Sequence, residues 1–95
     1  MDFRFEWDTA KAEANLWKHG VHFRDAVTAF ADPLSVTIAD AAHSEWEERL
    51  LLLGRSASGQ LLVVVHTERD DVVRIISARP ASRRESRKHE QETGW

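Results

Sequence analysis

Leu61-Leu62-Val63-Val64-Val65 is the longest apolar run in the chain, and the predicted architecture is built around it. Its five aliphatic residues leave no polar face, which is typical of a strand buried on both sides at the centre of a sheet. Before it, Arg49–Leu53 is a second strand, and the turn-forming Ser56-Ala57-Ser58-Gly59 joins the two as a hairpin. After it, Glu68-Arg69-Asp70-Asp71 predicts another turn, which leads into a strand over Val72–Ala78.

Two helices are predicted ahead of these strands. Phe3–Trp7 alternates apolar and charged residues, which predicts a short half-buried strand. Asp8 can then cap a helix that ends at Gly20, because glycine tolerates the left-handed conformation at a helix C-terminus. A second, short helix covers Phe23–Phe30 and is stopped by Asp32-Pro33.

The remaining elements complete an α+β pattern. Leu34–Ile38 is a strand, Ala39–Glu47 is a polar loop, and Ser82-x-x-Glu85 is a capping box that opens a final helix. The predicted order is β-α-α-β-β-β-β-α, and consecutive hairpins imply an antiparallel meander. We therefore predict one α+β domain over residues 1–95, a small antiparallel sheet with the two N-terminal helices packed on one face. The C-terminal helix, or a partner protein, covers the other face.

The first helix is expected to bury an apolar stripe. Residues at helical spacing form that stripe: Ala10, Ala14, Trp17 and Val21. A separate, polar side holds Lys11, Asn15, Lys18 and His22.

Composition narrows the class of protein. Of 95 residues, 42% are hydrophobic and 31% are charged, which is typical of a folded chain and not of a disordered one. No apolar run approaches the ~20 residues that span a bilayer, and the N-terminus lacks the apolar segment of a signal peptide. We therefore expect a cytoplasmic protein. The lack of cysteine excludes disulfides, thiol catalysis and thiolate zinc sites.

The net charge of −3 conceals an uneven distribution. The segment Arg74–Lys88 holds six cations and one acid, so a basic surface is compatible with an acidic total. Its densest part contains Arg79, Arg83, Arg84, Arg87 and Lys88. Two interpretations stay open: a solvated helix face, or a face that follows a phosphate backbone without reading sequence.

His66 ends the predicted central strand, and hairpin geometry suggests its neighbours. With loops over Ser56–Gly59 and Arg69–Asp71, His66 lies opposite Arg49 on one side and Arg74 on the other. Side chains directly opposite are about 5 Å apart. A one-residue slip in either turn moves an arginine to the other face.

Such a row would suit the cleavage of RNA without a metal. The 2′-hydroxyl is the nucleophile, so an enzyme needs a base for its proton, an acid for the leaving 5′-oxygen, and cations for the phosphoryl charge. Histidine titrates near neutral pH, and arginine matches phosphate with two donors. The alternative is that His66 ends a strand at a wet edge and the arginines are solvated. Similarly, the helix dipole alone explains Lys18-His19 at a helix C-terminus.

Four stretches of the chain share a more specific pattern: Phe5-Glu6-Trp7-Asp8-x-x-Lys11-x-x-x-Asn15-x-x-Lys18-His19-Gly20-Val21-x-Phe23, His43-Ser44-Glu45-x-Glu47-Glu48-Arg49, Gly54-Arg55-Ser56-x-x-Gly59-x-Leu61-Leu62-Val63-Val64-Val65-His66-Thr67 and Arg74-Ile75-Ile76-Ser77-Ala78-Arg79-x-Ala81-x-x-x-Glu85. Together, and in this order over Phe5–Glu90, they resemble the BrnT family.

The resemblance implies a set of site residues. His66 is expected as the acid or base, His19 as the second candidate for proton transfer, and Glu48 as a group that orients a base or pairs with an arginine. Phosphate and transition-state ligands are expected at Arg49, Arg74 and Arg79. RNA-binding cations are expected at Lys11 and Lys18 and, from the basic segment, at Arg83 and Arg84. No cofactor or metal is implied, and no spacing matches a zinc motif.

The resemblance also implies a function. BrnT proteins are bacterial type II toxins with a RelE-like fold, small metal-independent ribonucleases that inhibit translation. The expected partner is a BrnA-type antitoxin in a 2:2 complex, which binds DNA through its own domain. The expected substrate is RNA, either free or on ribosomes, and no membrane is involved.

Two other functions are compatible with the sequence. The first is a catalytically inactive toxin-like module that binds an antitoxin and acts in operon autoregulation. The second is a DNA-binding regulator, which the sequence favours less because it shows no helix-turn-helix with a basic recognition helix.

The sequence departs from the family pattern at two positions. His22 stands where a helix-capping serine is common, so the second helix is expected to begin more loosely. His89 stands where a tyrosine is common, which leaves open whether it replaces that residue in function.

Overall fold

The elements follow the predicted order. The computed structural model describes residues 3–43 and 47–93, and within them the order is β-α-α-β-β-β-β-α. The helices are α1 (Thr9–His19), α2 (Phe23–Thr28) and α3 (Arg83–Thr93), with two single turns of 3-10 helix, η1 (Ala29–Ala31) and η2 (Ala41–His43). The strands are β1 (Arg4–Glu6), β2 (Val36–Ala39), β3 (Leu50–Arg55), β4 (Leu61–Arg69) and β5 (Val72–Pro80). The α+β class is confirmed. In these ranges, no helix has the length and apolar character needed to cross a membrane.

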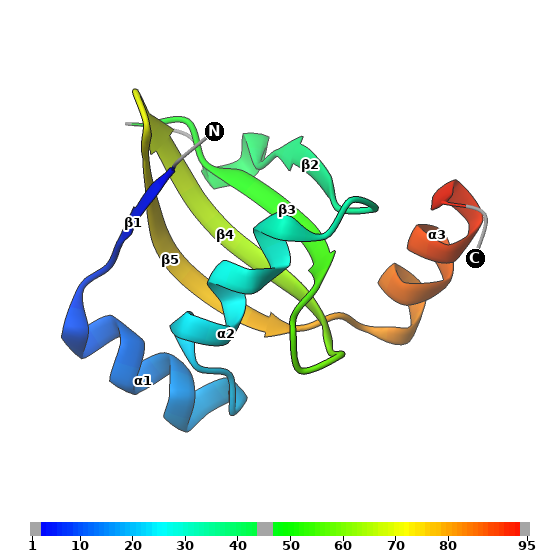
Figure 1. Cartoon of the computed structure of the whole chain (residues 1–95), viewed down its shortest axis with the longest axis horizontal. Coiled ribbons are helices and arrows are strands. Elements are labelled where there is room, and N and C mark those ends of the chain that lie inside the picture. Colours follow the sequence, from blue (N-terminus) through cyan, green and yellow to red (C-terminus); the bar gives the residue numbers. More distant parts are fainter. Residues whose placement is uncertain (1–2, 44–46, 94–95) are drawn as a thin grey trace.

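The strands form one sheet in the order β1-β5-β4-β3-β2 (Figure 1). Strands β2 to β5 are the predicted antiparallel meander. Strand β1 pairs parallel to β5, which was not predicted and makes the sheet mixed. The reason is topological, because β4 is already paired on both sides and the free edge of β5 is open to the N-terminal segment.

Strand β4 lies at the centre of the sheet, as its apolar run predicts. Leu62 and Val64 are fully buried on the face that we call inner, where they join the core with Phe23 and Ala26 of α2. Val63 points to the opposite, outer face and is also buried. The run is therefore covered on both sides, which explains why it has no polar residue.

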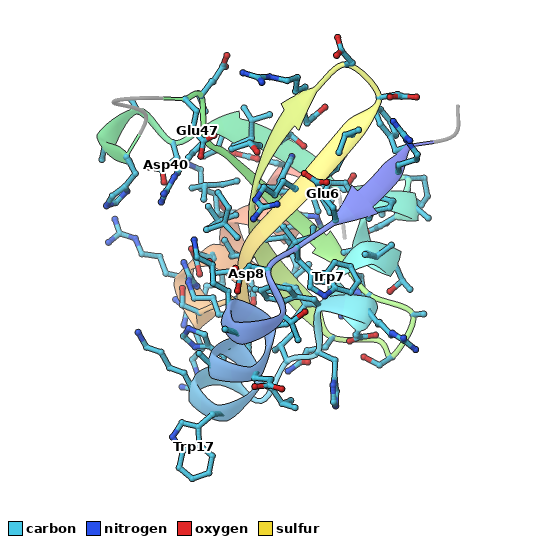
Figure 2. All side chains as sticks on the ribbon, turned by 90° about the vertical axis from the view of Figure 1, so that its left-hand side faces the viewer. Glu6, Trp7, Asp8, Trp17, Asp40 and Glu47 are labelled. Atoms are coloured by element: carbon cyan, nitrogen blue, oxygen red, sulfur yellow. The ribbon has the colours of Figure 1, made fainter. Side chains whose placement is uncertain are left out.

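Helix α1 is rotated relative to the prediction. Trp17 is 92% exposed, and Figure 2 shows its ring pointing away from the rest of the molecule. Ala10 and Ala14 are exposed as well, so the predicted buried stripe is wrong except for Val21, which belongs to the core. The residue of α1 that is buried is Asn15, which the sequence placed on the polar side.

Hydrogen bonding explains this rotation. The Asn15 side-chain amide donates to the carbonyl oxygens of Ala78 (2.8 Å) and Val21 (3.1 Å), and its oxygen accepts from the Ala78 N–H (3.0 Å). Strand β1 pairs with β5 only as far as Arg74, so beyond that point the edge of β5 that faces away from β4 lacks a neighbouring strand. Asn15 supplies the missing donor and acceptor, and this outweighs the burial of Trp17.

The predicted helix ends are confirmed. Asp8 accepts a hydrogen bond from the Lys11 N–H (3.0 Å), and Gly20 closes α1 in the left-handed region at φ 71°. Before α3, the Ser82 N–H donates to Glu85 (2.8 Å) while the Glu85 N–H donates to the Ser82 hydroxyl (3.1 Å). These reciprocal bonds are those of a capping box.

The two unusual histidines have different structural roles. His22 precedes α2 and makes no capping bond with its side chain, as expected from the missing serine. His89 is 4% exposed, and its Nε2 donates to the Leu34 carbonyl oxygen at 2.9 Å. His89 therefore anchors α3 to the segment that leads into β2.

Candidate functional site

The strand register differs from the predicted one on both sides of His66. Leu50 of β3 and Ile75 of β5 lie opposite His66, so the predicted row of Arg49, His66 and Arg74 is wrong. Both turns have other lengths than assumed, since Arg55 pairs with Leu61 and Arg69 pairs with Val72.

Two local features set the register between β4 and β5. Asp70 adopts a positive φ of 56°, which a two-residue hairpin turn requires. The register between β4 and β5 also shifts between Val65 and His66, where Ile76 is left without a partner as in a β-bulge.

His66 faces the inner side of the sheet and is 0% exposed. Its ring packs edge-on against Phe30, with ring centroids 4.8 Å apart. Its Nε2 lies 3.0 Å from the Glu68 carboxylate, and its Nδ1 lies 3.3 Å from the Val64 carbonyl oxygen. Both partners are acceptors, so a neutral imidazole can satisfy only one of them at a time. Because the Glu68 side chain is 37% exposed, it connects the buried ring to the solvent.

The three predicted arginines belong to the outer face. Arg74 pairs with Thr67, and Arg79 pairs with Val63, whose side chain points outward. Arg49 directly precedes Leu50, and the same register brings it level with Thr67. Thr67 therefore takes the place between the arginines that the sequence assigned to His66.

Arg79 is held by a bidentate ion pair. Its two terminal nitrogens donate to the two Glu85 oxygens at 2.8 and 2.9 Å, and one of them also contacts the Pro80 carbonyl oxygen at 3.3 Å. The bonds from Arg79, helped by those with Ser82, lower the pKa of Glu85 to about 2, and the bonds to Glu85 raise the pKa of Arg79. Glu85 therefore stays ionised and joins β5 to the start of α3.

A polar hollow of about 340 Å³ lies on the side of Arg74. It is lined by Glu6, Glu47, Glu48, Thr67, Glu68, Arg69, Val72 and Arg74, and Figure 2 shows Glu6 and Glu47 at this end of the molecule. Arg74 reaches Glu6 at 3.4 Å. The hollow brings together the predicted Glu48 and Arg74 with Glu68, the partner of His66. Sequence reasoning missed Glu68, although its position two residues after His66 places it on the same strand face.

The other predicted residues lie on the helices. His19 is half-buried at the end of α1, and Lys11 and Lys18 are exposed on the same helix. Arg83 and Arg84 are exposed in the first turn of α3.

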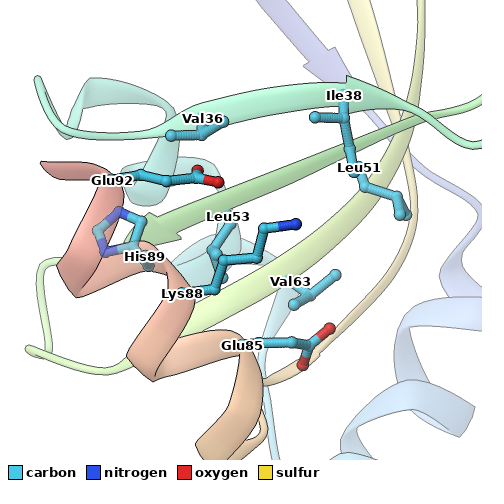
Figure 3. A pocket seen from close by; sticks show the side chains of 9 residues that line it. All are labelled: Val36, Ile38, Leu51, Leu53, Val63, Glu85, Lys88, His89 and Glu92. Carbon is cyan, nitrogen blue, oxygen red and sulfur yellow. The ribbon is translucent and has the colours of Figure 1, made fainter.

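A second hollow, which we call the groove, separates α3 from the outer face of the sheet (Figure 3). Its volume is about 260 Å³, and it is lined by Val36, Ile38, Leu51, Leu53, Val63, Glu85, Lys88, His89 and Glu92. The sequence predicted a C-terminal helix or a partner on this face, and α3 covers only part of it.

The chain matches one protein family in sequence and a solved structure in fold. Residues 7–85 match the model of the family described as "Ribonuclease toxin, BrnT, of type II toxin-antitoxin system". The crystal structure of the Brucella abortus ribonuclease toxin BrnT shares the fold, with a TM-score of 0.67 at 22% identity. That match covers 86% of this chain and 100% of the other. No curated protein matches the sequence.

The family match spans most of the chain, from the end of β1 to the capping box of α3. It includes His66, Glu68, the three arginines and the Arg79–Glu85 ion pair. A ribonuclease toxin of a type II toxin-antitoxin system has an RNA substrate and an antitoxin partner. The chain therefore belongs to the BrnT family of ribonuclease toxins of type II toxin-antitoxin systems.

Proposed function

We propose that this toxin cleaves RNA by metal-independent acid–base chemistry, that the cleavage inhibits translation, and that a BrnA-type antitoxin neutralises it in a two-to-two complex. One observation carries the proposal: Arg74, on the outer face, and Glu68, which belongs to the inner face and is bonded there to the buried His66, both line the hollow together with Glu48. A group able to accept a proton and a group able to bind phosphate thus adjoin one space.

In the proposed reaction, Glu68 takes the proton of an RNA 2′-hydroxyl. The 2′-oxygen then bonds to the adjacent phosphorus, the bond to the 5′-oxygen breaks, and the 5′-oxygen takes a proton, for which Glu48 is the proposed donor because it lines the hollow. His19, at the C-terminal end of α1, does not line the hollow and stays the second candidate. Arg74 binds the non-bridging phosphate oxygens as charge develops on them. His66 is 0% exposed, so we assign it a positioning role through its bond to Glu68 instead of direct contact with RNA.

The remaining predicted cations are proposed as RNA ligands. Arg49 and Arg79 extend the basic surface along the outer face from Arg74. Glu85 occupies one edge of the Arg79 guanidinium, and the group's other N–H donors can reach a phosphate. The proposed tracking contacts to the RNA backbone are Lys11, Lys18, Arg83 and Arg84.

A second function, a toxin-like module without catalytic activity, is favoured by the charges of the hollow. Its lining has four glutamates and two arginines, and a surplus of negative charge repels a phosphate backbone. Arg74 and Arg79 are each paired with a glutamate of the same chain. Such a module would bind an antitoxin in operon autoregulation but leave RNA intact.

A cleavage assay separates the two functions. Purified wild-type protein, with the chelator EDTA present, is expected to cut a labelled RNA. Arg74→Ala and Glu68→Gln are expected to slow the cut by roughly 100-fold, the lower end for loss of a transition-state ligand or a general base. Arg4→Ala is the matched control, because Arg4 is also an exposed arginine paired with a carboxylate, at 3.7 Å from Asp71, but does not line the hollow.

Each outcome has a defined meaning. If folded wild-type protein leaves RNA intact with and without added divalent ions, the inactive module is the better description. Cleavage that occurs only with divalent ions would refute the metal-independent chemistry. If Arg74→Ala and Glu68→Gln slow cleavage no more than Arg4→Ala does, the catalytic site lies elsewhere.

A further inference from the structure

The groove beside α3 has a wholly aliphatic floor. Val36 pairs with Leu53, which pairs with Val63, so these three side chains form one row across β2, β3 and β4. Ile38 pairs with Leu51 in the next row. Ile38 is 57% exposed, the highest value for a large aliphatic side chain in residues 3–43 and 47–93. The floor is therefore an apolar surface that the chain itself leaves exposed to solvent.

Two residues of α3 hold the helix in place beside the groove. Glu85 is fixed by its bidentate bond to Arg79, and His89 is fixed by its bond to the Leu34 carbonyl oxygen. These bonds fix the position of α3 beside the sheet. In that position a space of about 260 Å³ lies between the helix and the floor.

Lys88 differs from these two residues. Within the described part of the chain it has no ion pair or side-chain hydrogen bond. Figure 3 shows its side chain extending from α3 across the groove. The wall also carries Glu92, one turn after Lys88, whereas the charge of Glu85 is already matched by Arg79. The ammonium group of Lys88, which extends over the aliphatic floor, is complementary to a segment that carries aliphatic side chains and a carboxylate.

The chemistry of the groove discriminates between classes of occupant. RNA binding needs donors for phosphate or aromatic rings for bases, and the floor offers neither. The volume lies just below the range of about 300–1,000 Å³ that is usual for small-molecule sites, which suits a few side chains of another polypeptide. A second copy of this chain, with its net charge of −3, is disfavoured by mutual repulsion.

We propose that this groove is the docking site of the antitoxin, through a segment whose aliphatic side chains enter the groove and whose acidic residue pairs with Lys88. The inference rests on the proposed function, in which an antitoxin neutralises the toxin. An antitoxin bound in the groove would inhibit RNA binding, because the groove wall includes Glu85 and Glu85 holds Arg79, a proposed phosphate ligand. The bound acidic segment lies beside Arg79 and repels RNA from that side of the outer face.

The test is the dissociation constant of the complex between this chain and the antitoxin encoded in its own operon, measured by isothermal titration calorimetry. Ile38→Glu places a charge on the groove floor, and Lys88→Glu reverses the charge on its wall. Each is expected to raise Kd at least about tenfold, and the Lys88→Glu effect is expected to shrink at high salt.

Thr37→Glu is the matched control. Thr37 is the exposed neighbour of Ile38 on the same strand, and alternation points it to the opposite face of the sheet. Its Kd is expected to stay within about twofold of the wild-type value. Circular dichroism of each variant checks that the fold is kept, and Lys88→Glu keeps the test decisive if Ile38→Glu does not fold.

Three results would overturn the inference. The first is an equal Kd for Ile38→Glu, Lys88→Glu and wild type. The second is weaker RNA binding in these two variants with unchanged antitoxin binding, which would make RNA the occupant. The third is the loss of a homodimer in sedimentation without any change in antitoxin binding. A wild-type chain that binds no antitoxin at all would instead refute the proposed neutralisation, so the two failures are distinguishable.

Discussion

The two faces of the sheet are built from similar aliphatic residues but are covered very differently. On the inner face, Leu62, Val64 and Ile75 are at most 1% exposed, because α2 and the turn after it close over them. On the outer face, α3 covers one end only, and Ile38 is 57% exposed. The inner face is thus completed by the chain itself, while the outer face leaves apolar area for another molecule.

Polar side chains differ between the faces in the same way. The polar groups buried on the inner side, Asn15 and His66, are bonded to other parts of the protein. On the outer side, Arg74 and Arg79 are paired but about half-exposed, so their partners can be exchanged. Mutations on the inner side should therefore change stability, and those on the outer side should change binding or catalysis.

The largest expected effect compares one aliphatic residue from each face. Leu62→Ala should lower the free energy of unfolding by about 3–4 kcal/mol, because it leaves a cavity beside β4. Ile38→Ala should lower it by less than about 1 kcal/mol, since the side chain is already largely in water. Urea denaturation measures both values. Similar losses for the two variants would show that the outer face is as tightly packed as the inner one.

The next effect concerns the rotation of α1. Asn15→Ala should lower the free energy of unfolding by about 2–3 kcal/mol, because it leaves the Ala78 N–H and carbonyl oxygen without their partner. Trp17→Ala, the control on the same helix, should change it by no more than about 0.5 kcal/mol. If urea denaturation shows a larger loss for Trp17→Ala than for Asn15→Ala, the apolar stripe predicted from helical spacing, and not Asn15, faces the core.

The smallest effect concerns the Arg79–Glu85 pair on the outer side. Glu85→Gln should lower the free energy of unfolding at pH 7 by about 1 kcal/mol, a modest value because the pair is partly exposed to solvent. The pKa of Glu85 is lowered to about 2 from its ordinary 4.5, so the folded state binds its proton more weakly than the unfolded state. This contribution is therefore complete above pH 4.5 and is lost as the pH falls towards 2.

Urea titrations of wild type and Glu85→Gln at several pH values between 7 and 2 test this prediction. The stability difference between the two proteins should shrink across the window from pH 4.5 to pH 2. A difference that stays constant over that window would show that Glu85 does not act through its charge.

The sequence by itself determined the order and ends of the elements, because these depend on local interactions. Asp8, Gly20 and the pair Ser82 and Glu85 act on backbone groups within a few residues of themselves, so their roles can be read without the rest of the chain. The central place of β4 follows from Leu61–Val65 in the same way, since a strand with no polar face must be covered twice.

Only the tertiary structure decided the orientation of α1 and the surroundings of His66. Asn15 turns inward because Ala78, distant in sequence, presents an unpaired strand edge, and no helical pattern carries that information. A two-residue turn at Asp70 and the bulge at Ile76 set the register between β4 and β5. Because this register differs by one residue from the predicted one, His66 lies on the inner face while Arg74 lies on the outer face. Side-chain alternation has a period of two, so this turn and this bulge decided which residues share a face of the sheet.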